Sequence, residues 1–244
     1  MVLRRAAIAR APRGTRVARR RDVRWTVRVA TEHEVSPGFV REHTRRGRAA
    51  LVPEVALRLA DDVVALWEAL EAGEVDPGSD PPFWAAAWPG GQALARYVLD
   101  HPKVVAGRTV LDLGAGSGLV AIAALQAGAA RVLASEVDPY GRAAVAANAE
   151  DNGVGPLTVT GDLLDGEPDG AIDVVLAGDV CYDREMTERV LPFLGKAWLG
   201  GAAVYLGDPG RPYVPRDGLL EVATFDVPDT EGPQVRRTTV WRLP

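Results

Sequence analysis

The feature that most constrains the fold is a short apolar strand, 109–113, that runs directly into the glycine-rich loop Gly114–Gly118. A helical apolar pattern over 119–127 follows the loop. Glycines let a backbone approach a ligand closely, and the helix behind them presents free N–H groups. Strand, glycine turn and helix in this order are typical of a parallel sheet that binds its ligand at the carboxyl ends of the strands.

From residue 109 onward, strand and helix patterns alternate along the chain, and the last two strands have the pattern of an antiparallel pair. This alternation predicts an α/β fold: a doubly wound, mostly parallel seven-stranded sheet of Rossmann-like type, with helices on both faces and a closing antiparallel hairpin. The predicted strands are 109–113, 131–137, 157–160, 172–177, 202–206, 221–225 and 235–242, and the helices between them are 119–127, 140–151 and 185–198.

The chain before this alternation is predicted to be a basic tail, 1–22, and an N-terminal extension, 23–80. The tail is predicted to be disordered. Within the extension, 23–29 alternate as a short strand, and 36–48 and 53–73 have helical spacing. The ligand-binding domain is then 81–244.

Charge and composition narrow the possible functions. The first 48 residues hold 14 arginines against 4 acidic residues, a charge that suits nucleic acid or an acidic partner, or simply a solvated tail. The single cysteine, Cys181, excludes an intrachain disulfide, and the three histidines lack metal-ligand spacing, so no metal is predicted. No apolar run approaches the roughly 20 residues that span a bilayer. We therefore expect a cytoplasmic protein without a membrane partner.

The loop favours S-adenosylmethionine over a dinucleotide as its ligand. Dinucleotide loops have the spacing G-x-G-x-x-G, whereas the glycines here are Gly114, Gly116 and Gly118, around Ala115. Asp112 stands two residues before the first glycine. S-adenosylmethionine carries a sulfonium and an α-amino group and has no pyrophosphate, so a nearby carboxylate suits it and would repel a dinucleotide. We predict that these five residues contact the cofactor.

Acidic turns after later strands are the next candidates for cofactor contacts. Glu136 lies 22 residues after the first glycine, near the spacing at which an acidic residue accepts both ribose hydroxyls, and Val137 follows it. Asp162, next to Leu163, is placed to accept the adenine amino group. Asp138 is expected to cap the next helix. The alternative for the acidic residues is an ordinary role as solvated turn residues.

Together, 112–118, Glu136 and Asp162 resemble the successive cofactor motifs of seven-β-strand, class I methyltransferases. The tract 82–96 (PFWAAAWPGGQALAR) is similar to the segment before the first motif in the protein methyltransferase group. The stretch 177–183 (AGDVCYD) is similar to that group's Asp/Glu-x-x-Tyr/Phe motif.

The family that the chain resembles is the lysine methyltransferase of the electron-transfer flavoprotein β subunit, with its bacterial relatives. Residues 51–55 (LVPEV) and 207–211 (GDPGR) are also similar to that family, so the likeness covers about residues 50–244. It implies a protein substrate, with the flavoprotein β subunit as a candidate.

The resemblance also implies roles for the acceptor side of the site. Trp88 should flank the methionine end of the cofactor with Gly178 beside it, and Asp179 and Tyr182 should line the channel for the lysine. Because a charged Asp179 would hold the ammonium form, we assign it to orientation and binding rather than to a base. The alternatives are core packing for Trp84 and Trp88, a helix cap for Asp179 and packing for Tyr182. Cys181 is expected to pack in the core.

Other functions stay open at this point. A methyltransferase of this class could act on a ribosomal protein, on RNA or on a small molecule. The Asn-Pro-Pro-Tyr type of motif of amino-methylating nucleic-acid enzymes is absent, and 178–181 (GDVC) stand in its place, which argues against nucleic acid. A dehydrogenase is disfavoured by the glycine spacing. A non-catalytic cofactor-binding module is disfavoured because the motif residues are intact: Asp112, Gly114, Gly116, Glu136, Asp179 and Tyr182.

Overall fold

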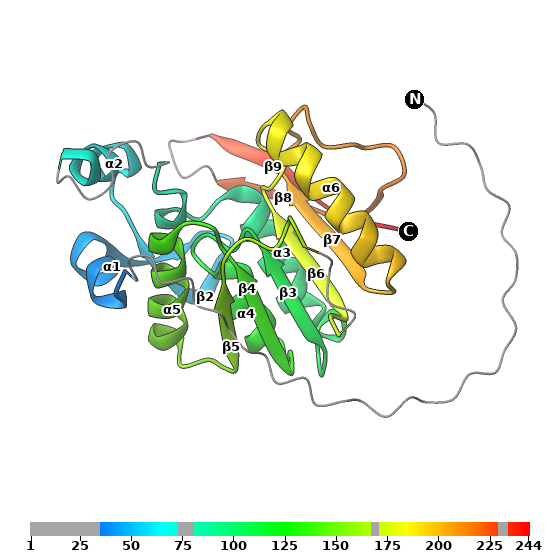
Figure 1. The fold of residues 1–244 in the computed structure, drawn as a ribbon, viewed down its shortest axis with the longest axis horizontal. Helices are drawn as coiled ribbons and strands as arrows, with labels where there is room; N and C mark the ends of the chain where they lie inside the picture. The colour runs from blue at the N-terminus through cyan, green and yellow to red at the C-terminus, as the bar shows by residue number, and fades with distance from the viewer. Residues whose placement is uncertain (1–34, 73–80, 167–170, 229–233) are drawn as a thin grey trace, which may run out of the picture.

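The computed structural model describes residues 35–72, 81–166, 171–228 and 234–244 (Figure 1). The predictions for 1–22 and 23–29 lie outside these residues. The main sheet has the order β5-β4-β3-β6-β7-β9-β8, in which β9 is antiparallel to both of its neighbours and the other pairs are parallel. The predicted seven-stranded sheet with its closing hairpin is confirmed. Its strands are β3 (Thr109–Leu113), β4 (Arg131–Ser135), β5 (Leu157–Thr160), β6 (Val174–Gly178), β7 (Ala203–Asp208), β8 (Leu220–Pro228) and β9 (Val235–Arg242).

Helices cover both faces of the sheet because strand side chains alternate between two apolar clusters. Val110 packs in one cluster with residues of α3, α4 and α5, while Leu111 and Leu113 pack in the other with α6. Figure 1 shows α3 and α6 on opposite sides of the sheet. Short 3₁₀ helices, η1 (Phe83–Ala85) and η2 (Pro102–Val104), flank α3. The helices are α3 (Pro89–Asp100), α4 (Leu119–Gln126), α5 (Pro139–Asn152) and α6 (Arg184–Leu199).

Two predictions for the N-terminal extension are wrong in part. The helix expected over 36–48 is α1 (Pro37–His43) followed by β1 (Arg45–Ala49), and the helix expected over 53–73 is β2 (Val52–Leu59) followed by α2 (Val63–Ala72). The apolar residues at 55, 57 and 59 fit a strand's two-residue period as well as they fit a helix. Pairing with β1 decides in favour of the strand.

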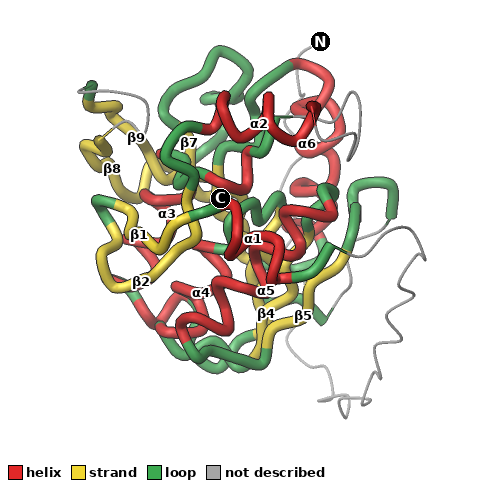
Figure 2. Tube along the Cα trace, turned by 90° about the vertical axis from the view of Figure 1, so that its left-hand side faces the viewer, coloured by secondary structure: helices red, strands yellow, loops and turns green. Residues whose placement is uncertain are grey.

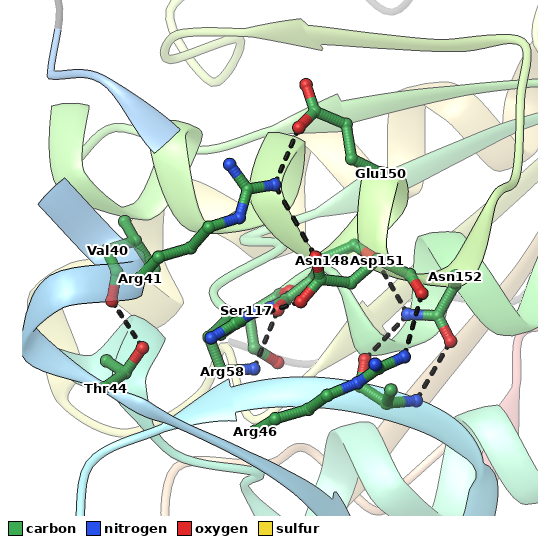
Figure 3. Close-up of polar contacts among 11 residues, drawn as sticks. Val40, Arg41, Thr44, Arg46, Arg58, Ser117, Asn148, Glu150, Asp151 and Asn152 are labelled. Carbon is green, nitrogen blue, oxygen red and sulfur yellow. Dashed lines mark hydrogen bonds and ion pairs between the residues drawn. The ribbon is translucent and has the colours of Figure 1, made fainter. Parts of the chain in front are cut away.

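Side chains of α5 also hold β2 in its extended form (Figure 3). Asn152 accepts from Ala56 N (2.9 Å) and donates to Ala56 O (2.7 Å). Asn148, which is fully buried, accepts from Arg58 N (2.7 Å) and donates to Ser117 O (2.8 Å) in the glycine loop. The β1–β2 hairpin is therefore linked through one side chain to the loop that was predicted to hold the cofactor.

The hairpin and α1 lie on one side of the molecule, with α1 beside α5 (Figure 2). The buried Val52, Val55 and Leu57 of β2 share an apolar cluster with α3 and α4. The segment before residue 81 thus contributes to the same core as the sheet. The boundary at residue 81 stays a prediction.

Local signals explain where α5 begins. Asp138 is its N-cap, with Oδ1 accepting from Tyr140 N at 2.8 Å, and Pro139 occupies the first turn. The expected cap is confirmed. The strand before it ends at Ser135 rather than at the predicted 137, because Glu136 turns its carboxylate back to accept from Asp138 N.

Candidate functional site

A cavity of about 350 Å³ lies at the carboxyl ends of β3, β4, β5 and β6. Strand order reverses between β3 and β6, which is where open α/β sheets bind ligands. Of the predicted site residues, the cavity brings together Trp88, Gly114, Gly116, Glu136, Val137, Asp162, Gly178, Asp179 and Tyr182. The cavity is also lined by Pro81, Phe83, Trp84, Leu113, Ser135, Asp138, Leu164, Val180, Met186 and Arg211.

The glycine loop forms the floor of the cavity. Gly114 and Gly116 have φ of 67° and 52°, a conformation that L side chains rarely adopt. A Cβ built on Gly116 meets no atom within 4 Å, so this glycine leaves open space for a ligand. Its N–H donates to Glu136 Oε2 at 2.7 Å, which ties the loop after β3 to the turn after β4.

Glu136 is the acidic residue at the end of β4. Its Oε1 accepts from Asp138 N at 3.0 Å, and only 9% of the residue is exposed. Burial raises the pKa of its carboxyl, and the hydrogen bonds from backbone N–H groups oppose that rise. A carboxylate has about four acceptor positions, more than these backbone contacts use, so ligand hydroxyls can also bind.

Asp112 lies behind the loop rather than in the cavity. It is 1% exposed, and its Oδ2 accepts from Ala121 N of α4 at 2.9 Å. Burial raises the pKa of this carboxyl to about 7. The contact ties the end of β3 to the first turns of α4. Ala115, Gly118 and Leu163 also do not line the cavity. Direct contact of these four residues with a cofactor stays a prediction.

Asp162 follows β5 on the side of the cavity far from β6. Its Oδ1 accepts from Leu164 N (2.8 Å) and its Oδ2 from Arg189 Nη2 (2.7 Å). Burial works to raise the pKa of this carboxyl, but these hydrogen bonds outweigh it and lower the pKa. Asp162 is thus an ionised acceptor in a fixed position.

Aromatic side chains border the opposite end of the cavity. Trp88 donates from Nε1 to Phe83 O at 2.8 Å, and its ring lies 5.9 Å from that of Phe83 between centroids. The Tyr182 ring lies 6.3 Å from Phe83 and is half exposed. Trp84 is 2% exposed and packs in an apolar cluster with α1 and α2 residues, while also reaching the cavity. The packing interpretation therefore holds for Trp84, whereas Trp88 and Tyr182 stand at the rim.

Asp179 directly follows β6 in an unusual backbone conformation. Its φ is 61°, and it is the one residue other than glycine in the described chain with positive φ. Such positions cluster at functional sites. Its Oδ2 accepts from Gly91 N at 2.8 Å, in the first turn of α3. A Cβ on Gly90 would overlap the carbonyl oxygen of Gly207. The lack of a side chain at Gly90 therefore lets the first turn of α3 approach β7 and present the Gly91 N–H to Asp179.

Arg211 is the site residue that sequence reasoning missed. Its Nη1 donates to Asp179 Oδ1 (2.6 Å) and to Asp208 Oδ2 (3.0 Å). Asp208 is fully buried, and its Oδ1 accepts from the backbone N of Gly210 and of Arg211, both at 2.7 Å. Burial raises the pKa of the Asp179 carboxyl, and the Arg211 guanidinium opposes that rise. The available signal was a basic residue three positions after a buried strand.

The remaining alternatives near Asp179 are also decided. The cap of α6 is Asp183, whose Oδ1 accepts from Met186 N at 2.7 Å, so the interpretation of Asp179 as that cap is wrong. Cys181 is fully buried in the cluster beneath α6, and burial raises the pKa of its thiol to about 11. Packing is confirmed for this cysteine.

The described residues hold no group of three or more His, Cys, Asp or Glu side chains that is arranged to bind a metal ion. Among the same residues, no helix has the length and apolar character needed to cross a membrane.

Comparisons with known proteins agree on one class. The family Ribosomal protein L11 methyltransferase (PrmA) matches residues 92–181. The electron transfer flavoprotein beta subunit lysine methyltransferase of Mus musculus is 37% identical over 197 residues, which are 78% of this chain and 76% of that protein. The Danio rerio protein of the same name is 41% identical over 202 residues, 79% of this chain and 77% of that protein. A Pyrococcus horikoshii structure assigned as an RNA methyltransferase has a TM-score of 0.51 and 22% identity over 72% of this chain and 96% of that chain, a likeness of fold alone.

Proposed function

The chain belongs to the electron transfer flavoprotein β subunit lysine methyltransferase family, and from this premise we propose that it transfers a methyl group from S-adenosylmethionine to a lysine side chain of a protein. The observation that carries the proposal is the cavity's division into two ends. Gly116, Glu136 and Asp162 follow β3, β4 and β5 at one end of the strand order, whereas Asp179 and Tyr182 follow β6 at the other. The first suits a nucleoside with an amino-acid tail, and the second suits a cationic side chain with an aliphatic stem.

The residues of the first end fit S-adenosylmethionine. Glu136 has acceptor positions left for the ribose hydroxyls, and Asp162 is an ionised acceptor for the adenine amino group. Gly116 leaves the space that a Cβ would take. Trp88 and Gly178 are proposed to border the methionine part. When bound, this cofactor supplies a sulfonium methyl that leaves as S-adenosylhomocysteine is released.

The residues of the second end would bind and orient the lysine. A free lysine has a pKa of about 10.4, so only about one in 2,500 is neutral at pH 7. The ammonium must release its proton to solvent before its nitrogen lone pair forms the new N–C bond. Asp179 is proposed to attract and orient the side chain, with Tyr182 and Phe83 packing on its methylenes. Holding nucleophile and methyl in line can lower the barrier by about 7 kcal/mol or more.

The proposed acceptor is the β subunit of electron transfer flavoprotein, as in the names of the relatives that match over three quarters of their length. A ribosomal protein is the second candidate, because the family Ribosomal protein L11 methyltransferase (PrmA) matches residues 92–181.

The test is to incubate the protein with methyl-labelled S-adenosylmethionine and purified electron transfer flavoprotein from the same organism, and to locate the label by mass spectrometry. The expected result is label on a lysine of the β subunit. Label on a lysine of another protein in whole extract, with none on the flavoprotein, would replace the acceptor and keep the reaction. An absence of lysine label in both would overturn the proposal.

A further inference from the structure

The cavity exposes an entering lysine to an excess of negative charge. Glu136, Asp138, Asp162 and Asp179 line it, and of these Asp162 is paired with Arg189, whose Nη2 lies 2.7 Å from Oδ2. Among the described lining residues, Arg211 supplies the only positive charge. Carboxylates near an ammonium raise its pKa, yet an amine accepts a methyl group only when it is neutral. A site with these carboxylates alone would bind lysine in its unreactive form.

Arg211 stands where it can oppose this effect. Its Nη1 lies between the carboxylates of Asp179 (2.6 Å) and Asp208 (3.0 Å), and 22% of its side chain is exposed. Asp208 also holds the backbone N–H of Arg211. Arg211 is therefore held both at its backbone N–H and at its guanidinium, and an arginine keeps its proton at any accessible pH.

The contact between Arg211 and Asp179 also limits how the Asp179 carboxylate can bind the ammonium group of a lysine. One of its oxygens accepts from Arg211 and the other from Gly91 N. The carboxylate keeps one orientation and offers only its remaining acceptor positions to a ligand. Asp179, Asp208 and Arg211 together carry one net negative charge, whereas the two carboxylates without Arg211 would carry two.

We propose that Arg211 is a positioning residue that holds the Asp179 carboxylate in place and, through its fixed positive charge, favours release of the proton from the bound target lysine. This inference rests on the lysine methyl transfer proposed above. The proton passes to solvent, after which the N–C bond forms as the C–S bond breaks.

The proposal predicts an unusual kinetic pattern for Arg211→Gln. Asp179 would then attract the ammonium more strongly, so KM for the acceptor should stay the same or fall. The bound lysine should lose its proton less readily. A unit charge within about 10 Å, in an effective dielectric near 20, shifts a pKa by about one unit or more. The midpoint of kcat against pH should therefore rise by about one unit, and kcat at pH 7.5 should fall about tenfold.

Two matched variants separate charge from shape. Arg211→Lys keeps the charge and loses the fork geometry, so its midpoint should stay within about 0.3 units of the natural protein's. Asp208→Asn removes a negative charge from the same network without lining the cavity, so its midpoint should move down. All three are assayed with electron transfer flavoprotein between pH 7 and 9.5, or with whichever protein the natural chain methylates. Calorimetric binding of S-adenosylhomocysteine and thermal unfolding establish that each variant is folded.

The outcomes are distinct. A rise of the midpoint in Arg211→Gln, retention in Arg211→Lys and unchanged S-adenosylhomocysteine affinity support the proposal. An unchanged midpoint in a folded Arg211→Gln, or equal shifts in Arg211→Gln and Arg211→Lys, overturn it while the proposed function stands. If Arg211→Gln fails to fold, an unchanged or raised midpoint in Asp208→Asn overturns it. If the natural protein binds S-adenosylhomocysteine but methylates no lysine, the proposed function fails and this inference fails with it.

Discussion

The two ends of the cavity are built in different ways. At the β3–β4–β5 end, Glu136 and Asp162 accept from backbone N–H groups at most 20 residues away, such as Gly116 N and Leu164 N, and Asp162 also accepts from Arg189, 27 residues later. At the β6–β7 end, Asp179 is held by segments that are farther away in the sequence. Asp179 joins Gly91, 88 residues earlier, and Arg211, 32 residues later.

The two ends therefore suit different tasks: one binds the cofactor, and the other controls the charge around the target lysine. Backbone N–H groups and glycines keep their place whatever the neighbouring side chains are, which suits a cofactor that is always the same. A buried carboxylate with positive φ and an arginine partner needs support from α3, β6 and β7 together. If the comparison is right, substitutions at the two ends affect different steps.

The largest effect is expected for Asp179→Asn. Asparagine tolerates positive φ, so the backbone should keep its place, but the pair with Arg211 and the charge that orients lysine are lost. We expect kcat/KM for the protein acceptor to fall about 100-fold or more, with the Kd of S-adenosylhomocysteine within about threefold of the natural value. The matched control is Asp183→Asn, which keeps a good cap on α6 and should retain activity. A large loss of cofactor affinity in Asp179→Asn would break the comparison.

The converse is expected for Glu136→Gln. The amide loses one of the two charged acceptor oxygens that serve Gly116 N and Asp138 N. Loss of a charge-assisted hydrogen bond corresponds to about 1.5–3 kcal/mol, so the Kd of S-adenosylhomocysteine should rise about 10- to 100-fold. At saturating cofactor, kcat should change less than about threefold. Glu150→Gln, on the exposed side of α5, is the control for calorimetry and should leave the Kd unchanged.

The same contrast explains what the sequence could predict. The glycine loop, Glu136 and Asp162 follow strands whose apolar patterns are clear, and every predicted strand of the sheet is present in the structure. Arg211 was missed because its partner, Asp179, lies 32 residues away in the turn after another strand, and no local pattern reports that pairing. The β1–β2 hairpin was missed for the same reason. The backbone of β2 is held by β1 and by Asn148 and Asn152 of α5, and these contacts leave no local pattern in the sequence.

A smaller effect, on stability and the cofactor end together, is expected for Asn148→Ala. The change leaves Arg58 N and Ser117 O without their buried partner, which costs about 1–3 kcal/mol. Tm should fall by about 3–8 °C, and the Kd of S-adenosylhomocysteine should rise several-fold because Ser117 lies in the glycine loop. Asn152→Ala is the matched control, since it contacts β2 and not the loop. It should lower Tm without changing the Kd. Equal effects of both variants on the Kd would contradict the link from hairpin to loop.

The smallest effect is expected for Asp112→Asn, and it should depend on pH. The pKa of Asp112 is raised to about 7 in the folded protein, above its ordinary value near 3.9. Its ionisation therefore costs stability increasingly as pH rises from about 4 to about 7. Asparagine keeps an acceptor for Ala121 N and cannot ionise. We expect Tm to rise more at pH 8 than at pH 5, because the cost of ionising Asp112 in the folded protein grows over this range. An equal change in Tm at both pH values would show that ionisation of Asp112 does not lower the stability of the folded protein.

We expect the ribose and adenine of the cofactor to lie at the β3–β4–β5 end, and its methionine part, beside Trp88 and Gly178, to leave Asp179 to the acceptor. A crystal structure of the protein with S-adenosylhomocysteine tests this most directly. The account predicts that the ribose hydroxyls lie within hydrogen-bond distance of Glu136, while Asp179 keeps Gly91 N and Arg211 as its partners and contacts no atom of the ligand. A structure in which the ligand's amino group binds the Asp179 carboxylate, or in which Glu136 contacts no ribose oxygen, would contradict it.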